Sequence, residues 1–182
     1  DSVIADGLSV DPVARLLNRL GVLPEALARA LDDYRPSGTL SRLLLELPED
    51  DRGHFRLTAD LRDINVQAHG GAPAARGLNG SLVMTQAGGL VQADSAELTF
   101  GFPQLFNELW DVRNFTANLG WRFEDELTRV YSSNIAMNFG PSAQLTGAFD
   151  LSLASDGEDQ WGLRVDVKDG NAGMLAEFVP VH

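Results

Sequence analysis

Side chains that could perform catalysis are few in this sequence, and their spacing does not suit it. The three histidines, His54, His69 and His182, are scattered, and none has a carboxylate or a second histidine at the spacing of a metal site or a catalytic triad. Ser132 and Ser133 lie in a strand-like run without the Gly-x-Ser-x-Gly turn that exposes a nucleophile. We therefore expect neither an enzyme nor a cofactor.

Two further patterns resemble ligand sites but are better explained as turns. The acidic segments Glu49 to Asp51 and Asp156 to Asp159 could bind a cation, yet neither has the ligand spacing of an EF-hand. We interpret both as solvated hairpin turns and expect no metal. The glycines between residues 70 and 80 lack the dinucleotide-binding spacing and open no helix, so we interpret them as turn and strand glycines.

The composition restricts the class of protein and its partners. The chain has 182 residues, 44% of them hydrophobic, which is enough to bury the core of one domain. Its 14 basic and 26 acidic residues give a net charge of -12, which repels nucleic acid and anionic membrane surfaces. There is no cysteine, and no apolar run approaches the roughly 20 residues of a membrane span. Because the sequence does not begin with Met, we expect an excised fragment of a longer parent.

Helical periodicity is confined to the N-terminal part, residues 8 to 35. Asp11 is the candidate N-cap of a first helix, with Pro12 at the first helical position. A second helix is expected from Pro24 until Pro36 to Gly38 interrupts it. Both helices are amphipathic, so they could pack on a sheet or lie over the mouth of a groove.

Period-two alternation, which is typical of strands, occupies the rest of the chain. It predicts eight strands, at about residues 40–47, 55–68, 80–86, 90–100, 115–124, 127–139, 145–153 and 161–168. One interruption, Pro103 to Asp111, predicts a short internal helix. That helix would carry four apolar side chains on one side: Leu105, Phe106, Leu109 and Trp110.

The cleanest alternation runs from Phe55 to Phe100, and its parity changes in mid-strand. The apolar side shifts by one residue after Arg62-Asp63 and again after Asp94-Ser95, with Ala96 on the apolar side. A similar shift occurs at Ser133-Asn134. Keeping one continuous dry face then requires an extra residue, which is a β-bulge. Bulges that recur in long strands predict a curved sheet.

The chain also resembles itself. Residues 47–65 align with residues 153–171 at a shift of 153 - 47 = 106, and a weaker register has a shift of 121 - 82 = 39. Such repetition is typical of arrays of similar β units. We expect one continuous structural unit divided into a helical segment (residues 1–38) packing on the sheet, a first β module (39–144) and the start of a second (145–182).

Apolar side chains are abundant on one face of the predicted strands. A second sheet could close over them as a sandwich core, or the sheet could stay open and bury them against helices or an apolar ligand. Long bulged strands favour the open, curved sheet. The residues expected on this face are Leu57, Leu61, Ile64, Val66, Leu82, Met84, Leu98, Phe100, Phe115, Leu119, Trp121, Phe123, Met137, Phe139, Phe149 and Leu151.

Several structural segments form a recognisable set: Leu23 to Leu31, Ala59 to Ala68, Gly71-Ala72-Pro73, Gly77 to Leu82, Asp94-Ser95, and Pro103 to Trp110. Together they resemble the YhdP family of AsmA-like proteins. The resemblance implies a mainly β fold, an open half-pipe of repeated curved modules. It also implies a Gram-negative envelope protein, anchored in the inner membrane, whose apolar groove spans the periplasm and carries phospholipids to the outer membrane.

On this basis we expect the sixteen apolar residues above to line a lipid groove. The predicted internal helix, with Phe106 and Trp110, would cap or gate it. The expected partners are phospholipid acyl chains and neighbouring β-groove modules of the parent, with no nucleic acid. The alternative is a closed β-sandwich used for adhesion or scaffolding, whose apolar face is entirely its own core.

Overall fold

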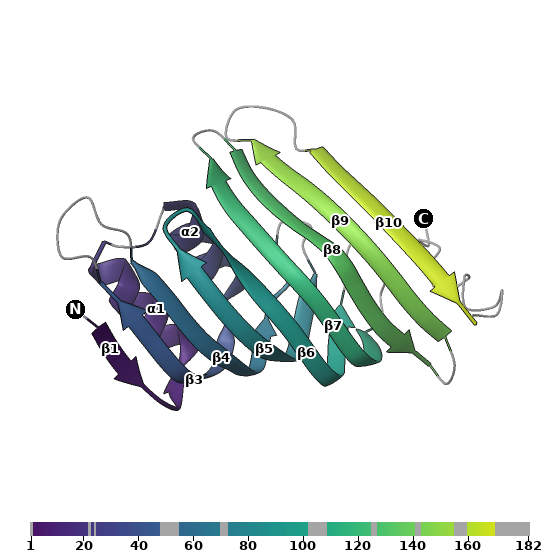
Figure 1. Cartoon of the computed structure of the whole chain (residues 1–182), viewed down its shortest axis with the longest axis horizontal. Coiled ribbons are helices and arrows are strands. Elements are labelled where there is room, and N and C mark those ends of the chain that lie inside the picture. The colour runs from purple at the N-terminus through teal and green to yellow at the C-terminus, as the bar shows by residue number, and fades with distance from the viewer. Residues whose placement is uncertain are drawn as a thin grey trace.

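The structure is a computed structural model that describes residues 2–21, 23, 25–47, 55–69, 73–101, 109–124, 127–140, 143–154 and 160–169. Its strands form one open antiparallel sheet of ten in the order β1-β3-β4-β5-β6-β7-β8-β9-β10, with β2 also paired to β3 (Figure 1). The elements are β1 (Ser2–Ala5), β2 (Leu8–Ser9), α1 (Val10–Arg19), α2 (Glu25–Tyr34), β3 (Ser37–Glu46), β4 (Arg56–Val66), β5 (Ala74–Thr85), β6 (Gly88–Gly101), β7 (Leu109–Glu124), β8 (Leu127–Phe139), β9 (Ala143–Ala154) and β10 (Gln160–Lys168).

This architecture confirms the predicted fold class. Each of the eight predicted strands is present, although β5 and β7 begin earlier than the alternation indicated. The prediction missed β1 and β2. These strands have four and two residues, too few for a period of two to be recognised.

The parity of the strands changes at two of the three places where the sequence predicted a bulge. In β4, Leu61 and Ile64 are both buried around Asp63, which has a φ of 50°, and the pairing with β5 shifts there. In β8 the pairing with β9 shifts between Ser132 and Ile135. An extra residue in one strand bends that strand and increases its twist, as expected for a curved sheet.

The predicted shift in β6 lies two residues too early. Ser95 is completely buried on the same side as Ala93, whereas Ala96, which we expected on the apolar side, is exposed. The reason is a hydrogen bond: the backbone N–H of Asn79 donates to the Ser95 hydroxyl over 2.8 Å. A satisfied hydroxyl can lie inside, so its polarity did not mark the exposed face.

Two asparagines fasten the bulges of β4 and β5 to each other. Asn65 Oδ1 accepts the backbone N–H of Gly77 over 3.1 Å, and Asn79 Oδ1 accepts the backbone N–H of Asp63 over 3.0 Å. Each amide nitrogen also donates to the carbonyl two residues earlier in its own strand, at 3.0 Å. The backbone groups that the bulges remove from the ladder are thereby paired.

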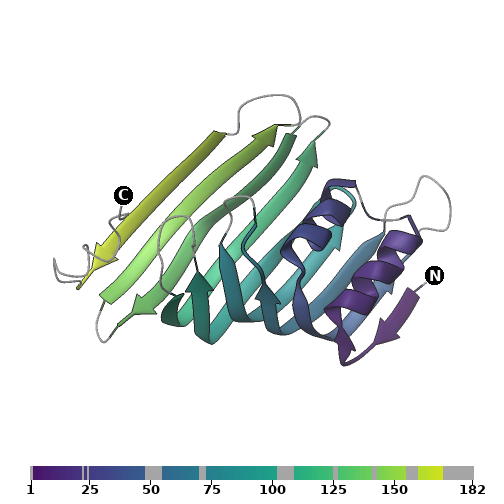
Figure 2. The same cartoon turned by 180° about the vertical axis from the view of Figure 1, so that it is seen from behind.

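Both helices lie on the same face of the sheet, over its N-terminal strands (Figure 2). Helix α1 buries Val13 and Leu17 against this face. Its N-cap is Ser9 and not Asp11, which lies in the first turn and forms an ion pair with Arg15. The negative charge of Asp11 suits the positive end of the helix dipole without being the cap.

Helix α2 is attached at its C-terminal end. The carbonyl of Tyr34 accepts the backbone N–H of Gln67 over 2.8 Å, and the Tyr34 ring meets the His69 ring edge to face. No helix in the described ranges is long and apolar enough to cross a membrane.

The predicted internal helix is wrong where it can be tested. Leu109, Trp110 and Asp111 belong to β7, and Trp110 pairs with Phe100 of β6. Leu109 and Trp110 therefore point to opposite faces of the sheet, whereas a helix would have placed them on one side. Leu105 and Phe106 lie outside the described residues.

Candidate functional site

Cross-strand pairing collects the apolar side chains of β3 to β9 on one face, which we call the apolar face. Paired residues of antiparallel strands share a face, so a row can be followed from strand to strand. One such row is Leu45, Leu57, Met84, Gly89, Trp121, Val130 and Leu151. Gly89 leaves room for its neighbour, because a Cβ there would lie 2.3 Å from Cζ2 of the Trp121 ring.

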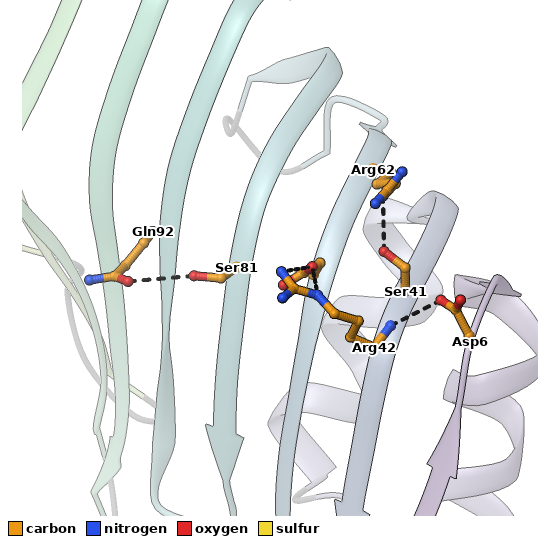
Figure 3. Close-up of polar contacts among 7 residues, drawn as sticks. Asp6, Ser41, Arg42, Arg62, Ser81 and Gln92 are labelled. Carbon is orange, nitrogen blue, oxygen red and sulfur yellow. Dashed lines mark hydrogen bonds and ion pairs between the residues drawn. The ribbon is translucent and has the colours of Figure 1, made fainter.

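The opposite face is more polar, although a row of it carries Leu44, Val83, Leu90 and Tyr131. Figure 3 shows part of it, where the backbone N–H of Arg42 donates to Asp6 Oδ1 over 3.1 Å and the Arg42 guanidinium pairs with Asp60. Nearby, Arg62 Nε donates to the Ser41 hydroxyl over 2.9 Å. These contacts link the N-terminal strands on the side away from the helices, and they are the polar interactions that distinguish this face from the apolar face.

The polar face continues along the sheet. The Ser81 hydroxyl donates to Gln92 Oε1 over 3.4 Å between β5 and β6. Between β8 and β9, Arg129 Nε donates to both Asp150 oxygens, at 3.1 and 3.0 Å. The hydrogen bond from Arg129 lowers the pKa of the exposed Asp150 carboxyl, and the nearby positive charge adds to this effect.

Helix α1 covers the first part of the apolar face. Four predicted lining residues, Leu57, Leu61, Ile64 and Met84, are between 1% and 7% exposed and belong to one core cluster with Val13 and Leu17. Three more, Val66, Leu82 and Trp121, pack against its margin. In this part the apolar side chains contact protein.

A central cluster occupies β6 and β7 and consists of Ala93, Leu98, Val112, Phe115 and Ala117. Three other predicted lining residues pack against it: Leu119, Met137 and Phe139. At one end the Trp110 ring lies 6.4 Å from that of Phe100 and 5.4 Å from that of Phe139, between ring centroids. Trp110, predicted to cap the groove, is thus part of the apolar face itself, whereas Leu109 is 55% exposed.

The C-terminal strands leave their apolar side chains more accessible. Phe123, Phe149 and Leu151 are partly buried. Three residues of β10 that we did not predict lie on the same face: Leu163, Val165 and Val167, which are 63%, 52% and 43% exposed. Leu163 pairs with Phe149, and Val167 pairs with Leu145. The strict alternation of residues 161 to 168 was a sufficient signal for this row.

In the described part of the chain, few titratable side chains lie close enough together to form a catalytic or metal site. His69 Nε2 lies 3.7 Å from Asp33 Oδ1, and both side chains are about half exposed. Burial raises the pKa of the neighbouring Tyr34, and the charge of Asp33 adds to the rise. Within the described ranges no three His, Asp or Glu side chains cluster as metal ligands would. His54, His182 and both acidic turns lie outside those ranges.

The fold and its surface define a class of protein: a single-layer, open antiparallel β-sheet with one apolar and one polar face, covered by helices over its N-terminal strands. The chain belongs to the YhdP family, whose family model, described as YhdP protein, matches residues 2–182. This confirms the resemblance found in the sequence. The comparisons with curated proteins and with solved structures found no match.

Proposed function

We propose that this chain works as part of a periplasmic, bridge-like protein that carries phospholipids between the inner and outer membranes of a Gram-negative bacterium. The parent protein would be anchored in the inner membrane, and the chain would act without catalysis. Membership of the YhdP family and the open sheet with one apolar face support this proposal.

The physical requirement for such a path is a dry surface. Exposing an acyl chain to water costs about 0.8 kcal/mol for each CH2 group, so moving a two-chain lipid through the periplasm unprotected costs tens of kcal/mol. A continuous apolar face removes most of this cost. Such a face must offer a wide apolar surface and needs few specific polar contacts. The aliphatic and aromatic side chains of β4 to β10 provide that surface.

The observation that carries the proposal is the accessible apolar row on β10. Leu163, Val165 and Val167 are exposed on the same face as Phe149 and Leu151, in the described part of a sheet with no second layer over them. Large exposed apolar surfaces are unfavourable in water unless something binds there. We therefore place acyl chains on β8 to β10, whereas residues beneath α1, such as Leu57, would contact lipid only after the helices move.

Neighbouring β modules of the parent are the proposed protein partners. Among the described strands β10 pairs only with β9, so its outer edge presents backbone donors and acceptors to a further strand. A strand added there would extend the apolar face without interruption. The adhesion or scaffolding alternative requires a closed sandwich, and the described strands form one sheet.

Photocrosslinking in Gram-negative cells tests the proposal. A benzophenone amino acid at Val165 faces the apolar side, and the same probe at the adjacent Asp166 faces the polar side as a matched control. We expect phospholipid adducts, identified by mass spectrometry after purification, at Val165 and not at Asp166. Adducts with protein alone at Val165 would support the scaffolding alternative, and equal lipid labelling at both positions would contradict a one-sided path.

A further inference from the structure

Two bulge residues with a positive φ are held in the same way by the segment beside them. Asp63 of β4, which has a φ of 50°, donates its backbone N–H to Asn79 Oδ1 of β5 over 3.0 Å. Arg42 of β3, which has a φ of 48°, donates its backbone N–H to Asp6 Oδ1 over 3.1 Å. The extra residue of a bulge leaves the ladder, so its backbone groups need another partner. In both places the side chain of an aspartate or asparagine is that partner.

The strand at the edge of the sheet, β10, repeats the plan of β4 (Figure 1). At the shift of 106, three residues recur unchanged: Leu57 as Leu163, Asp60 as Asp166, and Asp63 as Asp169. Asp169 follows β10 directly and has a φ of 56°, close to that of Asp63. Among the described residues, however, no aspartate or asparagine side chain accepts its N–H, and β10 pairs only with β9. What β5 supplies to β4 is therefore not supplied to β10 by the described part of the chain.

The apolar side of β10 differs from that of β4 in the same respect. Leu57 and Leu61 of β4 are 1% and 7% exposed, because β4 lies between two strands and belongs to the core under α1. Their counterparts in β10, Leu163 and Val167, are 63% and 43% exposed. Apolar side chains at an unpaired sheet edge favour the addition of another strand.

We propose that the free edge of β10 binds an antiparallel strand of the same kind as β5, in the register of the β4–β5 pair. This inference rests on the proposed function, because the strand belongs to a neighbouring β module of the parent. It specifies what that strand carries. An aspartate or asparagine accepts the N–H of Asp169, and apolar side chains lie opposite Leu163 and Val165.

The β4–β5 pairing fixes the register of the added strand. Ala59 pairs with Leu82 and Leu57 with Met84, so at the shift of 106 the counterpart of Leu82 lies opposite Val165 and that of Met84 opposite Leu163. These positions are on the apolar face, which the added strand continues. The charged Arg164 between them lies opposite the counterpart of an uncharged residue, so no like charges oppose each other there.

A peptide with the sequence of β5, Ala74–Thr85, is the probe for such a strand. Fluorescence anisotropy measures its binding to the 182-residue chain. The peptide variant Asn79→Ala removes the acceptor and should bind about two- to tenfold more weakly, which corresponds to one hydrogen bond. Asn79→Asp keeps an acceptor oxygen and should restore binding, whereas Thr85→Ala, at the far end of the peptide, should change nothing.

Cysteine pairing tests the register, because the chain has no cysteine of its own. Val165→Cys in the chain should form a disulfide with a peptide that carries Leu82→Cys. Leu163→Cys should not, since it lies diagonally from that position and not opposite it. Leu163→Cys should instead react with a Met84→Cys peptide. Both chain positions are more than half exposed, so the substitutions leave the core untouched.

The outcomes separate this inference from the function on which it rests. Absence of peptide binding, equal binding of the Asn79→Ala peptide, or equal disulfide formation by both chain cysteines would each overturn it. Lipid adducts at Val165 in cells would then still support the lipid path. If those adducts were also absent, the lipid path would fail as well.

Discussion

At the scale of single residues, the close approach of neighbouring strands depends on glycine. Gly80 of β5 has a φ of 157°, and a Cβ at this position would lie 2.1 Å from the carbonyl oxygen of Gln92 in β6. Backbone cannot move aside as a flexible side chain can. The strand spacing at this point therefore excludes any side chain.

Gly80→Ala should consequently destabilise the protein by about 1–3 kcal/mol or more, because the strands must separate and the backbone is strained. The matched control is Gly162→Ala in β10, where a Cβ meets nothing within 4 Å. We expect that change to stay within about 0.5 kcal/mol. Urea unfolding followed by circular dichroism measures both, and equal effects would contradict the proposed steric cause.

The Arg129–Asp150 pair makes stability depend on pH at the acidic end. Its hydrogen bond lowers the pKa of Asp150 in the folded protein, so the unfolded protein binds the proton more readily. The stabilisation is complete above the unfolded pKa of about 3.9 and is lost as the pH falls through the lower folded pKa. The difference in unfolding free energy between the unaltered protein and Asp150→Asn should therefore shrink in acid. A difference that stays constant with pH would count against this pair as its source.

Side-chain polarity alone located most, but not all, of the buried face. The alternation around Asp63 placed Leu61 and Ile64 correctly, since both strand halves are unambiguously apolar on one side. It failed at Ser95, where a hydrogen bond from another strand makes burial of a hydroxyl favourable. A contact between residues so far apart in sequence leaves no local pattern to read.

At the scale of elements, α1 decides which part of the apolar face is covered. Leu17 is 2% exposed and belongs to a core cluster with side chains of β3 and β4, whereas its neighbour Leu16 is 52% exposed. Leu17→Ala should destabilise the protein by about 2–5 kcal/mol through the cavity it leaves. Leu16→Ala should change stability by about 0.5 kcal/mol or less. Chemical denaturation of the two variants compares them, and a large loss for Leu16→Ala would show that its exposed face is also packed.

The segment before β7 shows why some element predictions fail. Leu109 and Trp110 fit both the apolar stripe of a helix and the start of a strand, so the sequence alone does not decide between the two. Pairing with β6, which runs from Leu109 to Arg122, shows that these residues form a strand. Tertiary hydrogen bonds of this kind outweigh a local helical preference.

The longer internal repeat has a counterpart in backbone geometry. At the shift of 106, Asp63 corresponds to Asp169, and these residues have φ values of 50° and 56°. Asp60 and Asp166 also correspond, but their arginine partners do not, because Arg42 lies on the neighbouring strand β3 and Arg164 lies two residues before Asp166 on β10. The positive φ at Asp63 and Asp169 is the backbone feature that the two segments share.

At the scale of the whole molecule, the net charge of -12 should oppose the approach of the chain to an anionic membrane. Like charges repel, and salt screens this repulsion over a Debye length of about 10 Å at 0.1 M ionic strength. Uptake of a fluorescent phospholipid from anionic vesicles should therefore become faster as salt is added. Uptake from zwitterionic vesicles, the control, should respond little. A slower uptake from anionic vesicles at higher salt would indicate attraction to the membrane instead.

The choice between an open sheet and a sandwich illustrates the limit of reading the sequence. Both architectures require strands with one dry face, so Leu57, Leu98 and Trp121 fit either. The difference lies in the order of pairing: each strand from β3 onward pairs with the next in the chain, and none of the described strands crosses to a second layer. Bulge positions favoured the open form because they bend a sheet.

The bulges also affect which length changes this gene can tolerate. Removing one codon within a regular stretch, for example between Leu57 and Leu61, would turn every following side chain of that strand to the wrong side. At Asp63, and at Ser133-Asn134, the strand already accommodates a surplus residue, so loss of one residue there changes the curvature and the register locally. Deletions of a single codon should therefore be tolerated at these bulges and should prevent correct folding in the regular stretches between them.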